Sequence, residues 1–387
     1  MISNPSTDRR IRNPGGANDC ASDLAVAQRS HMNDRKMPTP PATASFATDP
    51  AADEFVAFLS TPGSYAERPD IVEVRETHMS RVFLAGEFVY KLKRPICTAY
   101  LDFSTLAKRE YHCRNEVRLN RRLAPDVYLG VVALTRETDG TLKLDGAEPA
   151  VEWLVKMRRL PEDRMLDNAI RSATVDARKL DEVADLLIGF FGRLEPAGIS
   201  VAHYLSRLES QLQQDRAILC DDRYDLPPGL AGTVLDRLQS VIWSGNGPMN
   251  GNLPPERIVE GHGDLRPEHV CLCNPPVIID CLEFNRSLRL VDPLDDIGYL
   301  AMECGFLGAD WIGDHVLRRV CDGLGIEPVA HLIAFYKACR ATLRARLSLA
   351  HLLDPHPRTP GKWRPQALAY LEIANRESAR IHPPAAR

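Results

Sequence analysis

The feature that most constrains this chain is a pair of aspartates 16 positions apart, each in a different kind of local sequence. Asp264 lies in the polar stretch 260–270, which contains Gly, His and Pro, and Asp280 directly follows the apolar run 277–279. The polar stretch predicts a loop, and the apolar run predicts a short buried strand that ends at the second carboxylate. With a short strand pair over 269–282, both carboxylates are expected to converge on one place in the fold.

Size and composition set the class of protein. The chain has 387 residues, enough for two lobes that each bury a core. Apolar residues make up 44% and charged residues 26%, and the net charge of −4 creates no field that attracts nucleic acid or an anionic membrane. No apolar run reaches the ~18–20 residues of a membrane span, and the first residues lack a secretory signal. We therefore expect a cytoplasmic protein without nucleic-acid or membrane partners, in an oligomeric state that the sequence does not fix.

The chain divides into three segments of different composition. Residues 1–50 predict a disordered leader, because Pro, Ala, Ser, Thr, Asn and Asp dominate and no apolar period is present. Residues 51–158 predict an N-lobe of strands with one helix, and residues 159–382 predict a mainly helical C-lobe. The loop 260–283, which carries both aspartates, belongs to the C-lobe. This order predicts an α+β protein with two lobes.

Periodicity and turn residues locate the elements within the lobes. Strands are predicted at 71–75, 81–84, 87–93, 127–135, 141–144 and 150–157. Helices are predicted at 53–60, 104–122, 176–194, 201–219, 230–243 and 296–379, the last broken at 323–325 and 354–365. Ser104 and Asp296 are the expected N-caps of the helices that begin at these residues.

Asp264 is the candidate catalytic base. It lies two residues after His262, in the order His-x-Asp of kinase catalytic loops, where a carboxylate accepts the proton of an attacking hydroxyl. Alone, such a tripeptide is more often a turn with a capping aspartate. Asp280 is the candidate ligand for Mg²⁺, although an aspartate at a strand end is often only a turn former. The spacing of the two favours the kinase layout, and so the transfer of the γ-phosphoryl group of ATP.

Two further residues of the loop have less certain roles. His269 stands five residues after Asp264, where the kinase pattern has an Asn for a second metal, and imidazole is a poor ligand for Mg²⁺. Either one metal suffices, or His269 keeps only a hydrogen-bond role. Arg266 either stabilises the charge of the transition state or lies on the surface. Glu268 is expected to point away from the site if the backbone is extended.

A lysine on a strand is the candidate phosphate ligand. Lys91 and Lys93 lie on the predicted strand 87–93, and the period of two places both on the same face. The pattern V-A-I-K favours Lys91, but spacing does not choose between them. Glu116 on the following helix is the best partner, with Glu110 as the second choice. The alternative is a solvated charge on an edge strand.

The loop that would cover the phosphates is expected at 77–81. It contains no G-x-G-x-x-G, so backbone amides or the hydroxyl of Ser80 would have to bind the phosphates. A Walker-type G-x-x-x-x-G-K-[ST] is absent from the whole sequence, which excludes an ordinary P-loop kinase.

These residues resemble the aminoglycoside phosphotransferase-like branch of the protein-kinase-like fold. The resemblance is carried by HGDLRPEHV, VIIDCLEFN and VDPLDDIGYL, and it covers about residues 55–375. More narrowly, the chain is similar to an uncharacterised bacterial subgroup that is often fused to a C-terminal P-loop ATP-binding domain, through segments such as HMSRVFLAGEFVYKLKRP and NEVRLNRRLAPDVYLGVV. That partner domain is expected to be missing here.

The resemblance implies a kinase-like architecture with ATP and Mg²⁺ in the cleft. By motif, it makes Asp264 the base, Asp280 the metal ligand, and Lys91 with Glu116 the pair that positions the phosphates. It also implies a supporting role for Asp296, because in kinase-like folds such an Asp braces the catalytic loop. The acceptor would be a hydroxyl group of a small molecule that the resemblance does not name. For an antibiotic-modifying enzyme an acidic acceptor site is expected, with the candidates Glu283, Asp310 and Asp314.

Three functions stay open. The leading one is an ATP-dependent phosphotransferase that acts on a small molecule. The second is a nucleotide-binding regulatory pseudokinase without transfer activity, suggested by His269 and by the missing glycine loop. Protein phosphorylation is third, suggested by the likeness of DLRPE-H to the protein-kinase DLKPE-N. It ranks last because no A-P-E motif follows Asp280.

Overall fold

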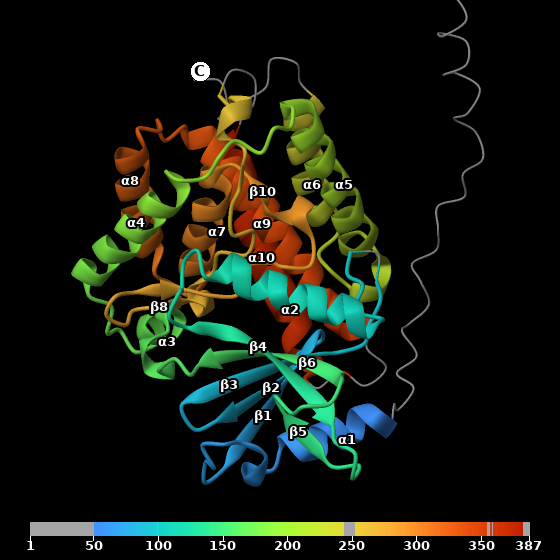
Figure 1. Cartoon of the computed structure of the whole chain (residues 1–387). Helices are drawn as coiled ribbons and strands as arrows, with labels where there is room; N and C mark the ends of the chain where they lie inside the picture. Colours follow the sequence, from blue (N-terminus) through green and yellow to red (C-terminus); the bar gives the residue numbers. More distant parts are fainter. Residues whose placement is uncertain (1–49, 99, 244–251, 354–356, 358, 382–387) are drawn as a thin grey trace, which may run out of the picture. The chain divides into compact units, whose positions relative to one another are not determined.

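The computed structural model describes residues 50–98, 100–243, 252–353, 357 and 359–381. All of them belong to one unit of the chain, Thr43–Arg387. The expected leader lies, apart from its last residue, outside the described residues. Within the unit, a strand-rich part is followed by a helix-rich part (Figure 1), so the expected α+β fold with two lobes is confirmed.

The strand-rich part is one antiparallel sheet of six strands, in the order β1-β2-β3-β6-β4-β5. The strands are β1 (Val72–Glu76), β2 (Ser80–Ala85), β3 (Phe88–Lys93), β4 (Tyr128–Arg136), β5 (Leu142–Leu144) and β6 (Ala150–Arg158). Both predicted hairpins are present. Ala85 pairs with Phe88 across a turn at Gly86, whose φ of 61° suits glycine, and Arg136 pairs with Leu142.

Side chains alternate between the two faces of the sheet along each strand, so each face has its own apolar side chains. A different helix packs on each face. These helices are α1 (Pro50–Leu59) and α2 (Leu106–Asn120). On one face, Phe55 and Leu59 of α1 pack in a cluster with Leu92 of β3. On the other face, Val117 of α2 packs in a cluster with Val155 of β6. Helix α2 lies between the sheet and the helix-rich part (Figure 1).

The helix-rich part has its own apolar core. Its helices are α3 (Leu166–Arg171), α4 (Ala177–Phe191), α5 (Val201–Leu219), α6 (Leu230–Trp243), α7 (Pro293–Phe306), α8 (Asp310–Leu324), α9 (Ala330–Ala350) and α10 (Pro360–Ile381). Helix α7 is buried on all sides over most of its length, although it carries the acidic residues Asp295, Asp296 and Glu303 as well as apolar ones. No helix among the described residues is long and apolar enough to cross a lipid bilayer.

Four short strands shape the loops in front of this core. Strand β7 (Val259–Glu260) pairs with β10 (Leu290–Val291), and β8 (Val270–Cys271) pairs with β9 (Val277–Ile278). The second pair is the hairpin that the sequence predicts. The first pair is not predicted, because two-residue strands leave no visible period in a sequence.

Both predicted N-caps are wrong by one to four residues. Helix α2 is capped by the hydroxyl of Thr105, while the hydroxyl of Ser104 binds an aspartate of the preceding loop. Helix α7 is capped by Asp292, because Pro293 fits the first helical position, where no amide proton is needed. Asp296 therefore lies inside the helix and has another role, described below.

Candidate active site

A cavity of about 590 Å³ lies between the sheet and the helix-rich part. Its polar lining includes Thr77, Ser80, Lys91, Asp264, Arg266, Glu268, His269, Asp280 and Glu283. Its apolar lining includes Val82, Val89, Val127, Met157, Leu160 and Ile279. Six of the eight candidate residues from the sequence thus meet in one cavity. The other two, Lys93 and Glu116, lie behind Lys91.

The carboxylate of Asp296 binds the backbone of the loop that carries Asp264. The amide of His262 donates to Asp296 Oδ2 at 2.7 Å, and the amide of Gly263 donates to Asp296 Oδ1 at 2.9 Å. Burial raises the pKa of the Asp296 carboxyl to about 6, although Arg340 nearby favours the ionised form. Asp296 therefore connects the loop to the central helix α7, the supporting role that the resemblance also implies.

His262 links the loop to the end of β9. Its Nε2 lies 2.9 Å from the carbonyl of Ile279, and its Nδ1 lies 3.3 Å from the amide of Asp264. A carbonyl only accepts, so the proton belongs on Nε2, and Nδ1 accepts from the amide. The ring is fully buried, and burial lowers the pKa of His262 to about 3. His262 is therefore a neutral structural residue of the site.

This buried histidine predicts a loss of stability in mild acid. In the unfolded chain a histidine binds a proton near pH 6.5, whereas folded His262 does so only near pH 3. The stabilisation is complete above pH 6.5 and is lost progressively as the pH falls toward 3, by about 1.4 kcal/mol for each pH unit. Urea denaturation between pH 7.5 and 4.5 measures the slope.

In the same experiment, His262→Asn should remove this part of the pH dependence. The exposed His203 is the matched control, because His203→Asn should leave the slope of the wild type. Identical slopes for the wild type and for His262→Asn would contradict the assignment.

One imidazole ring lies between the two aspartates. Asp264 Oδ2 is 3.7 Å from His269 Nδ1, and Asp280 Oδ2 is 3.7 Å from His269 Nε2. Nδ1 also lies 2.8 Å from the carbonyl of Asp264 itself. The two carboxylates therefore converge from separate segments, with His269 as the spacer.

The guanidinium of Arg266 reinforces the charge of Asp264. Arg266 Nε lies 3.1 Å from Asp264 Oδ1, without the alignment of a hydrogen bond. Burial acts to raise the pKa of Asp264, but Arg266 and His269 outweigh it, so the pKa lies below its usual range. Asp264 is therefore ionised at neutral pH and able to accept a proton.

Glu268 does not point away from the site. Residues Pro267–His269 form a 3₁₀ turn instead of an extended segment, so Glu268 lines the cavity and pairs with Arg266. The expectation depended on an extended backbone, and this segment does not have one. Arg266, held between Asp264 and Glu268, is not a surface residue.

Asp280 has an unusual backbone conformation. Its φ is 61°, in the left-handed region that non-glycine residues seldom occupy, and its amide donates to the hydroxyl of Tyr128 at 3.1 Å. The carboxylate reaches Lys91, with Oδ1 2.8 Å from Nζ. Its partial burial acts to raise its pKa, but the ion pair with Lys91 outweighs this and holds the pKa well below the usual range. Such conformations persist at functional sites, where the surroundings fix them.

The two lysines of β3 have different surroundings. Lys91 Nζ lies 2.9 Å from Glu116 Oε1, and Lys93 Nζ lies 2.6 Å from Glu116 Oε2. The side chain of Lys91 is 17% exposed and lines the cavity, whereas that of Lys93 is 0% exposed. Of the two, Lys91 is therefore placed to meet a ligand. Glu110, the second-choice partner, pairs with Arg114 instead.

The donors available for a metal ion are few. Among the residues that the structure describes, no group of three or more His, Cys, Asp or Glu side chains could hold an ion by itself. Asp280 nevertheless presents a carboxylate that is 45% exposed on the cavity side. Because Mg²⁺ usually takes one or two protein carboxylates together with substrate phosphates, Asp280 fits such an ion. His269 fits poorly, because its Nε2 lies 3.1 Å from a guanidinium nitrogen of Arg266.

Of the acids considered for the acceptor, only Glu283 lines this cavity. Its carboxylate is paired with Lys93, which does not line the cavity. Asp310 begins α8, and Asp314 lies near Lys337, 3.8 Å from its Nζ. These placements do not form an acidic acceptor site.

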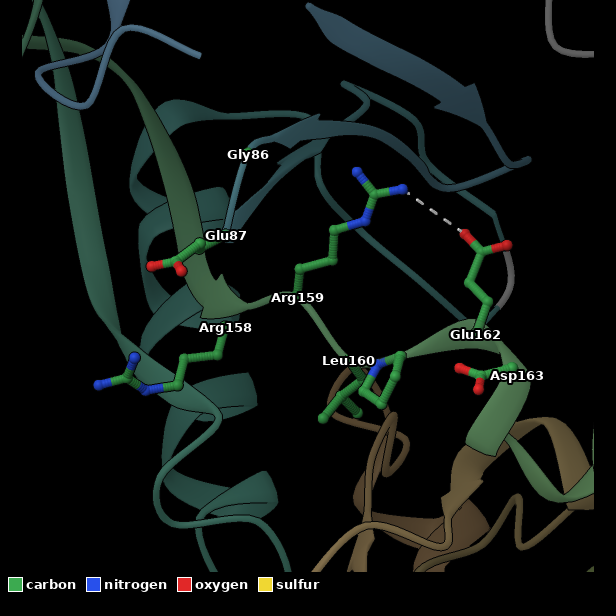
Figure 2. Close-up of a pocket in the computed structure, with 8 residues that line it drawn as sticks. Gly86, Glu87, Arg158, Arg159, Leu160, Glu162 and Asp163 are labelled. Atoms are coloured by element: carbon green, nitrogen blue, oxygen red, sulfur yellow. Dashed lines mark ion pairs between the residues drawn. The ribbon is translucent and has the colours of Figure 1, made fainter. Parts of the chain in front are cut away.

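A second cavity lies on the connection between the sheet and the helices (Figure 2). It is lined by Gly86, Glu87, Arg158, Arg159, Leu160, Pro161, Glu162 and Asp163. Arg159 lies 2.8 Å from Glu73 and 3.9 Å from Glu162. Arg158 and Leu160 line both cavities, so this connection separates the two. The second cavity contains none of the candidate residues.

Comparison with known proteins identifies relatives of undetermined function. No protein-family model matches the chain. The uncharacterized proteins Rv2004c of Mycobacterium tuberculosis and Mb2027c of Mycobacterium bovis are each 32% identical to it over 292 residues. The match covers 74% of this chain and 56% of each relative. The chain thus spans about half the length of the curated relatives it matches.

Solved structures of small-molecule kinases are similar at low identity. A choline/ethanolamine kinase family protein from Mesorhizobium loti is 17% identical with a TM-score of 0.48, over 85% of this chain and 98% of its own. A choline kinase from Cryptosporidium parvum is 10% identical with a TM-score of 0.48, over 85% and 94%. The aminoglycoside phosphotransferase APH(3'')-Id from Streptomyces rimosus is 17% identical with a TM-score of 0.42, over 76% and 98%. By themselves, similarities of this size do not indicate an activity.

Proposed function

We propose that this protein, whose two lobes have the protein-kinase-like arrangement of the aminoglycoside phosphotransferase-like branch, is an ATP- and Mg²⁺-dependent phosphotransferase. It moves the γ-phosphoryl group to a hydroxyl of a small molecule. The lobes comprise residues 51–158 and 159–382. The observation that carries the proposal is the convergence of Asp264 and Asp280 on opposite nitrogens of His269, in a cavity that Lys91 also lines.

Each requirement of phosphoryl transfer has a candidate group in the cavity. The apolar lining, with Val82, Val127 and Met157, can enclose a nucleotide base, and the ammonium of Lys91 can bind phosphate oxygens. Asp280 would hold Mg²⁺, which would neutralise part of the phosphate charge. Ser80 lines the same cavity at the start of β2, next to the loop expected to cover the phosphates.

Asp264 acts on the acceptor. As the acceptor oxygen forms its bond to Pγ, the bond from Pγ to the leaving oxygen of ADP breaks, and the hydroxyl proton passes to the Asp264 carboxylate. Arg266, fixed between Asp264 and Glu268, is the cation nearest to that carboxylate and offers charge stabilisation to the transferred group. His269 keeps the two aspartates apart and serves no metal.

Replacing Lys91 tests the nucleotide site. Lys91→Met should lower the affinity for ATP with Mg²⁺ by about tenfold or more, because a phosphate loses a charge-assisted partner worth about 1.5–3 kcal/mol. Glu116 keeps Lys93, so the fold should persist. Calorimetric titration with ATP gives the affinity, and Lys143→Met on the exposed edge strand β5 is the matched control. Equal affinities for the wild type and Lys91→Met would exclude this lysine.

A screen of metabolites for ATP-dependent phosphorylation tests transfer itself and seeks the acceptor.

The second candidate function is a regulatory nucleotide-binding protein without transfer activity. The ion pair between Lys91 and Asp280 favours this function, because the ammonium of Lys91 takes up the carboxylate that is proposed to bind the metal. ATP binding that does not depend on Mg²⁺, with no product from any acceptor, would support that alternative.

A further inference from the structure

A second buried lysine lies behind the one that lines the cavity. Lys93 Nζ lies 2.6 Å from Glu116 Oε2 and is also paired with Glu283. Glu116 is fully buried, and its other oxygen, Oε1, lies 2.9 Å from Lys91 Nζ. One buried carboxylate is therefore shared by two ammonium groups, of which one faces the cavity and one does not.

The ammonium of Lys91 has several anionic partners. In this structure its ammonium contacts both Glu116 and Asp280, at 2.9 and 2.8 Å. A triphosphate in the cavity would be a further partner. Opposite charges about 3 Å apart attract strongly where water is excluded. Any excess attraction of Lys91 to Glu116 therefore lowers its affinity for phosphate.

Lys93 weakens that competition, because it gives Glu116 a counter-ion that does not depend on Lys91. A buried carboxylate that loses its only cation carries a large desolvation penalty. With Lys93 in place, Lys91 can turn toward a phosphate while Glu116 stays paired. Lys93 is itself fixed, since it lies on β3 with its ammonium 4.9 Å from the centre of the Phe103 ring.

Glu283 has the opposite effect, because it attracts the same ammonium of Lys93. Its position does not depend on the carboxylate alone. The backbone carbonyl of Glu283 accepts a hydrogen bond from Asn115 Nδ2 of α2 at 2.7 Å. Two residues earlier, the amide of Cys281 donates to Asn120 Oδ1 at 2.9 Å. The segment after Asp280 therefore stays attached to α2 when the charge of Glu283 is removed.

We propose that Lys93 is a positioning residue that neutralises Glu116 and so frees Lys91 for the phosphates of the nucleotide, with Glu283 as the competitor for Lys93. This inference rests on the proposed function, because it concerns the affinity of the same cavity for ATP. It assigns Lys93 no contact with the ligand.

Two variants have opposite expected effects on nucleotide affinity. Lys93→Met/Glu283→Gln removes one cation and one anion and leaves Glu116 to Lys91 alone. Its affinity should fall about tenfold, which corresponds to about 1.4 kcal/mol. Glu283→Gln alone gives Lys93 wholly to Glu116, and its affinity should rise about twofold, or about 0.4 kcal/mol. The probe is adenylyl imidodiphosphate with Mg²⁺, titrated calorimetrically into the full chain.

The opposite signs separate positioning from a merely structural role, which would weaken binding in both variants or in neither. Weaker binding by a Glu283→Gln protein that melts at the wild-type temperature overturns the inference, even where the double variant does not fold. A folded double variant that binds as tightly as the wild type overturns it too. A wild-type chain that binds no nucleotide overturns the proposed function as well, so the two failures are distinguishable.

Discussion

Asp264→Asn should lower turnover by about 10²–10⁴-fold, the usual contribution of a positioned general base. An amide has nearly the shape of the carboxylate but cannot take up the proton of the acceptor hydroxyl. Asp264 reaches Arg266 and His269 without contacting Lys91, so the affinity for ATP should stay within a few-fold of the wild type. The expected result is thus a loss of kcat with little change in nucleotide binding.

The measurement uses the acceptor that gives the highest rate in a metabolite screen, with ADP formation followed in parallel. Asp126→Asn is the matched control, because it makes the same chemical change at an exposed position before β4. It should leave kcat unchanged. A turnover of Asp264→Asn equal to that of the wild type would remove this carboxylate from the mechanism.

Gly263→Ala should destabilise the fold by about 3 kcal/mol and disturb the site as well. Gly263 has φ at 85°, which costs an alanine about 1–2 kcal/mol. A Cβ at this position would lie 2.8 Å from the carbonyl oxygen of Leu288 and 3.3 Å from Arg289 Cα. Backbone on both sides would have to shift, and Asp264 is the next residue.

Gly140 provides a control with the same backbone angle and open space. Its φ is 87°, and a Cβ there would meet no atom within 4 Å. Gly140→Ala should therefore cost only the conformational part, about 1–2 kcal/mol. Urea denaturation of both variants measures the difference. Equal losses would show that the contact with Leu288 is relieved without cost.

Much of the fold was accessible from the sequence, because its elements carry strong local signals. The strand before Ala85 and the strand after Glu87 alternate regularly and are joined by a glycine that accepts positive φ, so their pairing follows from local rules. The start of α7 carries a local signal too, because Pro293 suits the first helical position and so favours Asp292 as the cap. The contact of Asp296 with the amides of His262 and Gly263 depends instead on the packing of α7 against a loop that is distant in sequence.

The sequence was sufficient to predict the residue types of the site, but not the contacts between them. Spacing brought Asp264 and Asp280 together, yet period two left Lys91 and Lys93 equivalent, and only the packing of α2 and Glu283 around β3 separates them. Nothing in the sequence marked Tyr128 as part of the site, because an aromatic residue in a strand usually belongs to the core. Its hydroxyl nevertheless accepts from the amide of Asp280.

The attachment of the catalytic loop to α7 has a consequence for how such a protein can diversify. Asp296 belongs to the most enclosed helix of the core, so any repacking around it would displace the chemical groups at the same time. If the protein is the proposed phosphotransferase, substitutions that change its acceptor without loss of the reaction are therefore expected at positions that do not carry this helix.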